Sequence, residues 1–314
     1  MRTPIINFEE ALVAKRFVYG GNAGAKEAIF HEGAVWMLKY PKTTRDLVNP
    51  QISYTTSPLS EYLGTKIYEI LGLPVHEVLL GIRKNKIIVA CKDFTQSELA
   101  PVRAKTLFHF HELKNRFMSS DLDEYSGTGS ETFLNEVLAT IQGEENLQDV
   151  PGVLERFWDM FVIDAFIDNN DRNNGNWGLL EDNATGELEL APVYDNGNAF
   201  FNKKSLKQMQ NRLSKESLMH EDAYKSPTCV YKYTGIDNEG HKIHPFKFIA
   251  EGANADCTSA VYRFLDRVDM SKIESLIEGI PESIGGLGVM PPIQKEFYLE
   301  LMKIRLEQLR SSVN

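Results

Sequence analysis

The sequence predicts an α+β fold with two lobes, a small antiparallel sheet carrying one helix and a larger, mostly helical part. Short apolar runs separated by turn residues fill most of residues 1–94, whereas helical periodicity dominates residues 95–314. The chain has 314 residues, 42% of them hydrophobic, which is enough for one large or two modest domains with a buried core. We therefore place the boundary between the lobes near residue 95.

The first lobe is expected to contain one helix among several strands. A helix is predicted to begin at Ser57, because Ser is a favoured N-cap and Pro58 suits the first helical position. Its apolar residues recur with a 3.6-residue period, and Gly72 with Pro74 ends it. Strands are predicted at residues 16–19, 28–30, 34–40, 77–82 and 86–92.

The second lobe is expected to be built on helices. The segment 153–167 is apolar on most sides and should be deeply buried. Residues 197–250 are polar and poorly periodic, so we expect a structureless, mobile functional segment there. Further helices are predicted at residues 131–141, 258–268, 271–279 and 292–309.

Composition excludes several classes of protein. The net charge is −10 and the pI about 5.3, so no basic surface indicates nucleic-acid binding. Three cysteines without a CxxC pair argue against a disulfide framework or a structural zinc site. Neither a signal-peptide core nor a membrane span is present in the sequence. These features favour a cytoplasmic protein.

The segment 168–178 carries the clearest chemistry. Asp171 and Asn176 have the spacing Asp-x-x-x-x-Asn, and a hairpin turn returns the chain to 192–197, which contains Asp195. Pairing the two strands places Asp195 within roughly 10 Å of Asn176. One carboxylate for an acceptor hydroxyl and two oxygen ligands for Mg²⁺ suit phosphoryl transfer. The alternatives are an ordinary turn-rich loop and a calcium loop, whose required Gly and Glu are absent at the sixth and twelfth positions.

The first lobe adds features that are individually weak but occur in a suggestive order. Lys39 lies in an otherwise apolar strand, where it either snorkels to solvent or reaches phosphates. Glu61, early in the following helix, either complements the helix dipole or pairs with Lys39. A Gly-rich turn before them can place backbone N–H groups against phosphate oxygens; its candidate residues are Gly20, Gly21, Asn22 and Gly24.

Together these stretches resemble the HipA family of bacterial Ser/Thr kinases, and most closely its smaller stand-alone, CtkA-type branch. The resemblance is carried by residues 20–24, 37–41, 60–62, 89–94, 171–178 and 191–195. It implies a protein-kinase-like fold that uses ATP and Mg²⁺, with Asp171 as catalytic base and Asn176 and Asp195 as metal ligands. Lys39 would bind phosphate with Glu61 as its partner. The backbone of Lys92, Asp93 and Phe94 would form the adenine-binding hinge.

The resemblance has departures and leaves alternatives open. Asn173 stands where the family usually has His, and no DNA-binding extension is visible. We expect transfer to Ser or Thr of an unknown protein substrate, including the chain itself, with no nucleic-acid or membrane partner. A small-molecule kinase of aminoglycoside or phosphoinositide type, or a nucleotide-binding pseudokinase, is the alternative. An intact set of Lys39, Asp171, Asn176 and Asp195 counts against a pseudokinase.

Some residues are assigned no chemistry. We interpret the pairs His109/His111 and His241/His244 as solvated side chains rather than a metal site. The cysteines are expected to be small buried hydrophobic residues. The aromatic residues of the helix at 153–167 are expected to belong to the core.

Overall fold

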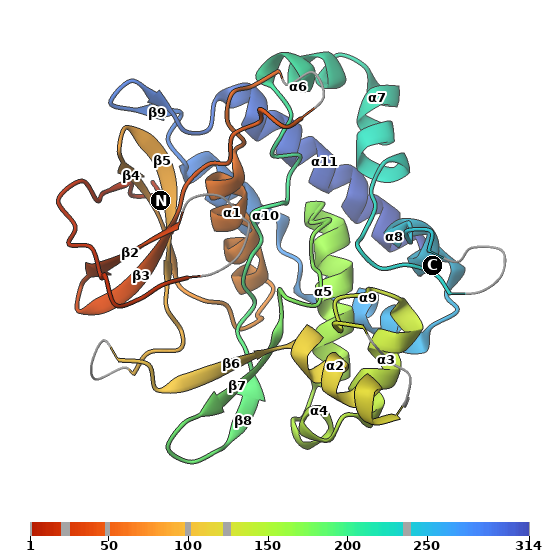
Figure 1. The fold of residues 1–314 in the computed structure, drawn as a ribbon. Coiled ribbons are helices and arrows are strands. Elements are labelled where there is room, and N and C mark those ends of the chain that lie inside the picture. The colour runs from red at the N-terminus through yellow and green to blue at the C-terminus, as the bar shows by residue number, and fades with distance from the viewer. Residues whose placement is uncertain are drawn as a thin grey trace.

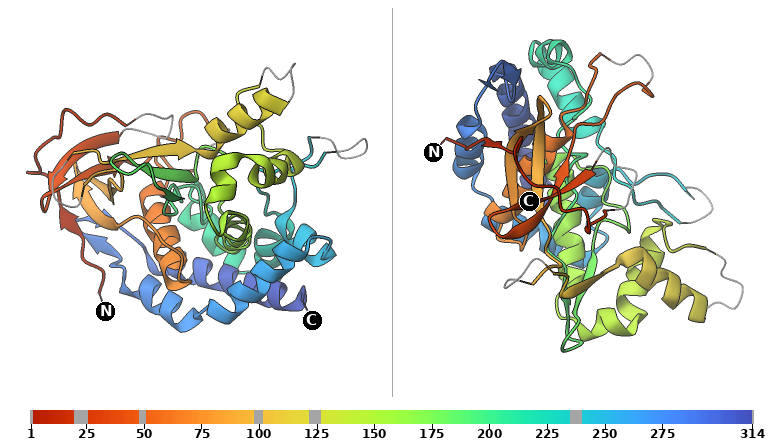
Figure 2. Two further views of the ribbon diagram at one scale, coloured as in Figure 1. Left: turned by 90° about the horizontal axis from the view of Figure 1, so that it is seen from below. Right: turned by 60° about the vertical axis from the view of Figure 1, so that its left-hand side comes forward.

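The computed structural model has a sheet at one end and helices through most of the remainder (Figure 1). In the left view of Figure 2 the sheet again lies to one side of the helical part. This arrangement confirms the predicted α+β fold class. The structure describes residues 2–19, 26–47, 51–97, 102–121, 127–234 and 240–313.

The larger sheet has five strands in the order β1–β4–β5–β3–β2, antiparallel except for the parallel pair β1–β4. One face buries Phe8, Trp36 and Leu38 in a small core of its own. The other face contributes Leu80 and Val89 to the main core. The strands span Ile6–Asn7 (β1), Lys26–His31 (β2), Ala34–Lys39 (β3), Val78–Arg83 (β4) and Lys86–Lys92 (β5).

Helix α1 (Ser57–Ile70) begins where the sequence predicts, with Pro58 in its first turn. Leu63 and Ile67 are fully buried and contribute to the main core on the sheet's inner side. Glu61 on the same helix is fully buried as well. Because an isolated buried charge is costly, Glu61 requires partners of opposite charge or hydrogen-bond donors.

A smaller sheet joins β6 (Lys105–His109), β7 (Gly178–Asp182) and β8 (Leu188–Leu190) in that order, all antiparallel. Strands β7 and β8 form the predicted hairpin, with Leu179 opposite Leu190. Strand β6 was not predicted, since five residues of mixed polarity give little local signal. It approaches β7 so closely that a Cβ on Gly178 would lie 2.0 Å from the carbonyl oxygen of Phe108.

Helix α5 (Val153–Ile167) runs through the middle of the helical part (Figure 1). Its aromatic residues Phe157, Trp158, Phe161 and Phe166 are buried, which confirms their assignment to the core. A short hairpin, β9 (Ser283–Ile284) and β10 (Leu287–Gly288), precedes the last helix. The surrounding helices are α2 (Phe110–Asp121), α3 (Leu134–Gly143), α4 (Glu145–Asp149), α8 (Pro245–Glu251), α9 (Ala255–Arg267), α10 (Met270–Gly279) and α11 (Pro292–Ser311).

The expectation that residues 197–250 are structureless is wrong. Three short helical segments fold there besides α8, and Figure 1 shows α6 and α7 beside α11. Each buries only one or two apolar side chains, such as Met209, Met219 and Ala223, so the sequence shows no clear period. The predicted strand at residues 16–19 is also absent. The three segments are α6 (Leu206–Leu213), α7 (Glu216–His220) and a π-helical turn, Glu221–Lys225.

The described part of the chain was also searched for membrane-spanning helices. None of its helices combines the length and the apolar character that crossing a bilayer requires.

Candidate active site

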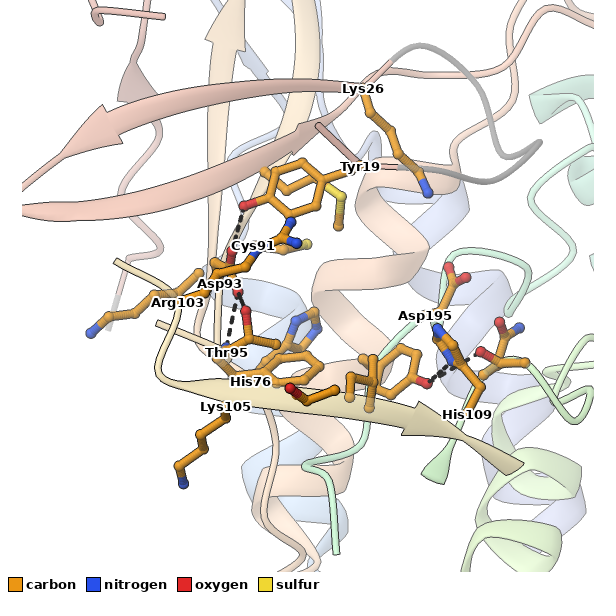
Figure 3. A pocket seen from close by; sticks show the side chains of 18 of the residues that line it. Tyr19, Lys26, His76, Cys91, Asp93, Thr95, Arg103, Lys105, His109 and Asp195 are labelled. Atoms are coloured by element: carbon orange, nitrogen blue, oxygen red, sulfur yellow. Dashed lines mark hydrogen bonds between the residues drawn. The ribbon is translucent and has the colours of Figure 1, made fainter. Parts of the chain in front are cut away.

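A cleft of about 650 Å³ lies between the larger sheet and strand β6 (Figure 3). Its volume falls within the range of small-molecule and cofactor sites. Many of the residues predicted for the site line this one cleft, although they come from parts of the chain that are far apart in the sequence. They are Lys39, Lys92, Asp93, Phe94, Asn176 and Asp195.

Lys39 makes two ion pairs at the inner end of strand β3. Its Nζ lies 2.9 Å from Oε2 of Glu61 and 3.0 Å from Oδ1 of Asp195. Burial by itself would lower the pKa of Lys39, but the carboxylates of Asp195 and Glu61 outweigh burial and raise the pKa above its ordinary value. The ammonium group therefore stays charged and fixed where β3, α1 and the chain after β8 meet.

Glu61 has a second partner, His76, which sequence reasoning missed. Nε2 of His76 lies 3.3 Å from Oε1 of Glu61, and both side chains are buried. Burial alone would raise the pKa of Glu61, yet Lys39 and His76 together hold it below its ordinary range. The ring of His76 also meets that of Phe94 edge-on, with centroids 6.2 Å apart. Oε2 of Glu61 is thus hydrogen-bonded to Lys39, whereas Oε1 lies beside His76 without a hydrogen bond among the described residues.

The predicted hinge directly follows strand β5. The N–H of Lys92 donates to the carbonyl of Glu77 at 2.9 Å, and the N–H of Asp93 donates to that of Val35 at 3.0 Å. No protein acceptor in the described ranges is bonded to the N–H of Phe94. Of the three hinge amides, that of Phe94 is therefore the donor open to a ligand in the cleft.

The side chain of Asp93 is engaged by the protein itself. Tyr19 donates its hydroxyl to Oδ2 of Asp93 at 2.8 Å, and the backbone N–H of Thr95 donates to Oδ1 at 2.9 Å (Figure 3). Tyr19 immediately precedes the predicted Gly-rich turn. Asp93 therefore ties the chain before that turn to the hinge.

The predicted catalytic loop, residues 168–178, begins where α5 ends, at Asp168, whose φ of 59° lies in the left-handed region. Asp171 is half-buried, and its Oδ1 accepts a hydrogen bond from Nδ2 of Asn173 at 3.1 Å. Nδ2 of Asn176 donates to the carbonyl of Asp171 at 2.6 Å. Because the amide nitrogen of Asn176 is used in this way, its side-chain oxygen is left available toward the cleft.

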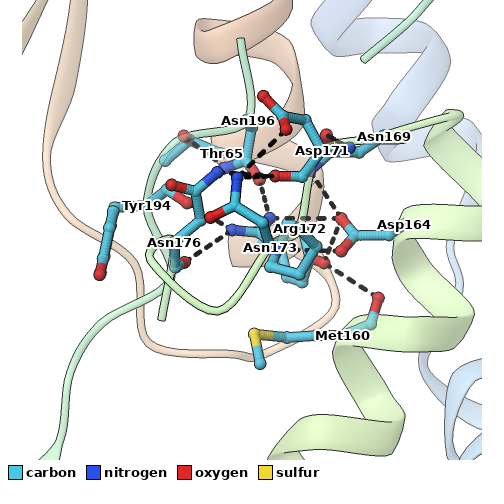
Figure 4. Close-up of polar contacts among 11 residues, drawn as sticks. Thr65, Met160, Asp164, Asn169, Asp171, Arg172, Asn173, Asn176, Tyr194 and Asn196 are labelled. Carbon is cyan, nitrogen blue, oxygen red and sulfur yellow. Dashed lines mark hydrogen bonds and ion pairs between the residues drawn. The ribbon is translucent and has the colours of Figure 1, made fainter. Parts of the chain in front are cut away.

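Arg172 fastens this loop to its surroundings (Figure 4). Its Nε lies 2.9 Å from Oδ2 of Asp164 on α5, and its Nη1 donates to the carbonyl of Asn176 at 3.1 Å. The same guanidinium donates to the carbonyl of Tyr194 and to the side-chain oxygen of Asn196. One buried arginine therefore joins α5, the catalytic loop and the chain that carries Asp195.

Asn196 in turn connects this chain to helix α1. Its Nδ2 donates to the hydroxyl of Thr65 at 3.1 Å, and a Cβ on Gly64 would lie 2.6 Å from Cβ of Asn196. The preceding residue, Asp195, has a φ of 59°, a strained region for a residue with a side chain. These contacts fix Asp195 relative to Glu61, three residues before Gly64 on the same helix.

Comparison with known proteins identifies the family. The serine/threonine-protein kinase CtkA of Helicobacter pylori is 34% identical over 307 residues, which cover 98% of this chain and 86% of that protein. This chain belongs to the CtkA family of serine/threonine protein kinases. The crystal structure of the Helicobacter pylori proinflammatory kinase CtkA matches it with a TM-score of 0.84 and 32% identity, covering 99% of this chain and 97% of the other.

A more distant structure shares the fold. HipA, in the complex of the Shewanella oneidensis HipA–HipB toxin–antitoxin system with its operator DNA, matches with a TM-score of 0.50 at 13% identity. The match covers 96% of this chain and 67% of the other. No protein-family model matches the chain. The resemblance to HipA-like kinases is therefore confirmed, at the level of the whole chain for CtkA and of the fold for HipA.

The predicted phosphate-binding turn of this CtkA-family chain, Gly20, Gly21, Asn22 and Gly24, lies outside the described residues. Lys26, the first described residue after it, lines the cleft and lies opposite Lys39 in the β2–β3 ladder (Figure 3). Burial and the neighbouring charge of Lys39 lower the pKa of Lys26. Sequence reasoning gave Lys26 no role, although its position beside the Gly-rich turn was the available signal.

The residues left without chemistry have mixed outcomes. His109 is not a solvated side chain, since it lines the cleft and its Nδ1 lies 2.9 Å from the hydroxyl of Tyr194. The cysteines are buried as expected, and burial raises the pKa of Cys229 and Cys257 to about 12. Among the described residues, one group of His, Cys and acidic side chains is compact enough to hold a metal ion, and it consists of Glu61, His76 and Cys91. Neither of the two histidine pairs belongs to it.

Proposed function

We propose that this chain transfers the γ-phosphate of ATP, with Mg²⁺, to Ser and Thr hydroxyls of proteins, itself included. The observation that supports this most is Lys39 lying between Glu61 and Asp195 in a nucleotide-sized cleft. In protein kinases a lysine on strand β3 pairs with a helix glutamate and holds the ATP phosphates near the metal-binding aspartate. Membership of the CtkA family supports a protein hydroxyl as acceptor.

The proposed roles follow from position and hydrogen bonding. Asp171 accepts the proton of the acceptor hydroxyl, and its orientation is set by the hydrogen bond from Asn173. Lys39 binds the phosphates, and the N–H of Phe94 binds the adenine. The sequence predicts that the backbone from Gly20 to Gly24 covers the phosphates, and these residues lie outside the described ranges.

The donors available for a metal fit Mg²⁺. The side-chain oxygen of Asn176 is not needed by the loop, because its amide nitrogen makes the internal hydrogen bond. Asp195 gives only Oδ1 to Lys39, so its Oδ2 is available. Amide and carboxylate oxygens are the ligands that a hard divalent cation prefers. Asn176 and Asp195 would hold the ion, which when bound neutralises charge on the phosphates.

Self-phosphorylation is proposed for the folded segment that follows Asp195. Ser205 is an unsuitable acceptor because it is buried and caps helix α6. Lys204 and Arg212, two cations near these hydroxyls, already pair with Asp222 and are not free to bind a new phosphate. The turn at residues 20–26 contains no Ser or Thr. The acceptors that remain exposed are Ser214, Ser217, Ser226, Thr228 and Thr234.

The partners proposed are a protein substrate and neither nucleic acid nor membrane. The net charge of −10 supports the absence of a nucleic-acid surface. We place the activity in the cytoplasm, and the three free, buried cysteines are consistent with a reducing compartment.

Incubation with labelled ATP and Mg²⁺, with and without a generic protein acceptor, tests the proposal. Wild type should label the acceptor and itself, and mass spectrometry should place phosphate on the exposed hydroxyls after Asp195. Asp171→Ala should lose transfer by about 10² to 10⁴ while ATP still binds. Transfer only to small molecules would indicate the alternative kinase class, and nucleotide binding without any transfer would indicate a pseudokinase. Near-normal transfer by Asp171→Ala would exclude Asp171 as the base.

A further inference from the structure

A second cavity, of about 280 Å³, lies in the helical part beside the catalytic loop. Two of the segments that line the nucleotide cleft continue into it. The catalytic loop contributes Asn176 to the cleft and Asn170 to the second cavity, and the chain after β8 contributes Asp195 to the cleft and Asn198 to the second cavity. Asp171 lines neither cavity but directly follows Asn170, so its backbone is one residue away from the lining of the second cavity.

The wall of the second cavity is held by hydrogen bonds between its own residues. Nδ2 of Asn198 donates to Oδ1 of Asn170 at 2.7 Å, which connects the catalytic loop to the chain that carries Asp195. Oε1 of Gln208 accepts from the N–H of Ser205, so its amide nitrogen is left to donate. The hydroxyls of Ser226 and Thr228 complete a lining rich in hydrogen-bond donors.

Among the charged side chains that line this cavity, one cation has no anionic partner in the described part of the chain. Asp168 lies 3.3 Å from Nη2 of Arg305, and Lys204 lies 2.6 Å from Oδ2 of Asp222, so these four side chains neutralise one another. Lys203 lines the same cavity, is exposed, and makes no ion pair with any residue that the structure describes. The rim is therefore positive although the whole chain is negative.

We propose that this second cavity is the acceptor subsite, which binds an acidic side chain one or two residues from the phosphorylated Ser or Thr. The inference rests on the proposed protein-kinase function. Consecutive Cα atoms are about 3.8 Å apart, so a peptide with its hydroxyl at Asp171 reaches the cavity beside Asn170 within one or two residues. A volume of 280 Å³ is too small for a nucleotide and fits one side chain with water, since a water occupies about 30 Å³.

A charge reversal tests the subsite. Peptides with one Ser and a flanking Glu, Lys or Ala at each position within two residues would be compared for transfer, and separately for binding to Asp171→Asn by fluorescence anisotropy. Wild type should favour Glu over Lys by about two- to fivefold, the effect of one exposed ion pair. Lys203→Ser should remove this preference and Lys203→Glu should reverse it, with the KM for ATP unchanged. Lys207→Glu, an exposed lysine outside the cavity, is the matched control.

The outcomes separate the subsite from the activity. An acidic preference in binding that follows the charge at residue 203 supports the subsite, even if no peptide is phosphorylated. Equal affinity for Glu and Lys peptides, failure of every peptide to bind, or an equal effect of Lys207→Glu would overturn it. Absence of transfer to peptides, proteins and the chain itself would contradict the proposed function instead.

Discussion

The guanidinium of Arg172 and the carboxylate of Asp164 form a buried ion pair, with Nε 2.9 Å from Oδ2 and Nη2 3.2 Å from Oδ1. Asp164 also accepts from the hydroxyl of Tyr68 at 2.8 Å and from Nδ2 of Asn169 at 3.0 Å. The pair therefore lies at the centre of a polar network beneath the catalytic loop (Figure 4). Such networks are costly to break, because the remaining charge stays buried without its partner.

Arg172→Met should lower the free energy of unfolding by about 3–5 kcal/mol, the usual cost of removing one partner of a buried pair. It should also lower kcat, since the loop and the chain carrying Asp195 lose their common anchor. Arg310→Met is the matched control, because Arg310 and Glu307 are both exposed in their pair, and it should cost no more than about 1 kcal/mol. Urea unfolding measures both, and equal losses would contradict the role of Arg172.

His76→Phe should lower kcat/KM for ATP by about 10- to 100-fold, because the buried Oε1 of Glu61 would lose the ring nitrogen that lies 3.3 Å from it and face an apolar ring. The reason is that Glu61 would lose the partner at Oε1 and hold Lys39 less firmly. His76→Gln should recover most of the activity, because its amide can donate to the same oxygen. Glu69→Gln, which alters an exposed pair on the same helix, should be neutral. If kcat/KM of His76→Gln were as low as that of His76→Phe, the shape of His76 and not its polar ring nitrogen would support the activity.

Asp195→Asn should weaken nucleotide binding with Mg²⁺ by at least about tenfold, as even indirect support of a metal is worth that much. Binding without metal should weaken less, because there the variant loses only the ion pair of Asp195 with Lys39. Asn tolerates the left-handed backbone of residue 195, so the variant tests the ligand atom rather than the fold. Titrations of nucleotide with and without Mg²⁺ measure the difference, and similar losses in both would count against metal coordination by Asp195.

Asp168 should make stability depend on pH. Burial raises its pKa to about 6, although Arg305 acts in the opposite direction. Because the folded-state pKa lies above the unfolded value, the stabilisation is fully present below the unfolded pKa and is lost as pH rises through about 6. Relative to Asp168→Asn, wild type should lose about 1 kcal/mol of unfolding free energy between pH 5 and 7.5.

Urea unfolding of both proteins at the two pH values checks this prediction. In the Asn variant Arg305 keeps its hydrogen bonds to the carbonyls of Ala223, at 3.0 Å, and Phe166, at 3.2 Å, so the reference should fold. If the unfolding free energy of wild type, relative to that of Asp168→Asn, stays constant or rises from pH 5 to 7.5, Asp168 ionises normally.

The sequence by itself determined the elements with strong local signals. Helix α5 and strand β5 lie where periodicity and apolar runs predicted them. Helix α1 begins at the predicted Ser57, although its N-cap is Thr56 and not Ser57. Strands β7 and β8 pair about the predicted hairpin turn. The Asp-x-x-x-x-Asn spacing also indicated the chemistry, because the residues of the motif are neighbours along the chain.

Only the tertiary structure decided how distant residues combine. His76 meets Glu61, and Arg172 joins Asp164 to the chain at Asn196, through packing that no local pattern encodes. The helices between residues 205 and 225 each bury too few apolar residues to produce a period, and α11 supplies the surface that stabilises them. Local order is visible in sequence because neighbours along the chain create it, whereas a shared carboxylate or a second cavity exists only after the chain has folded.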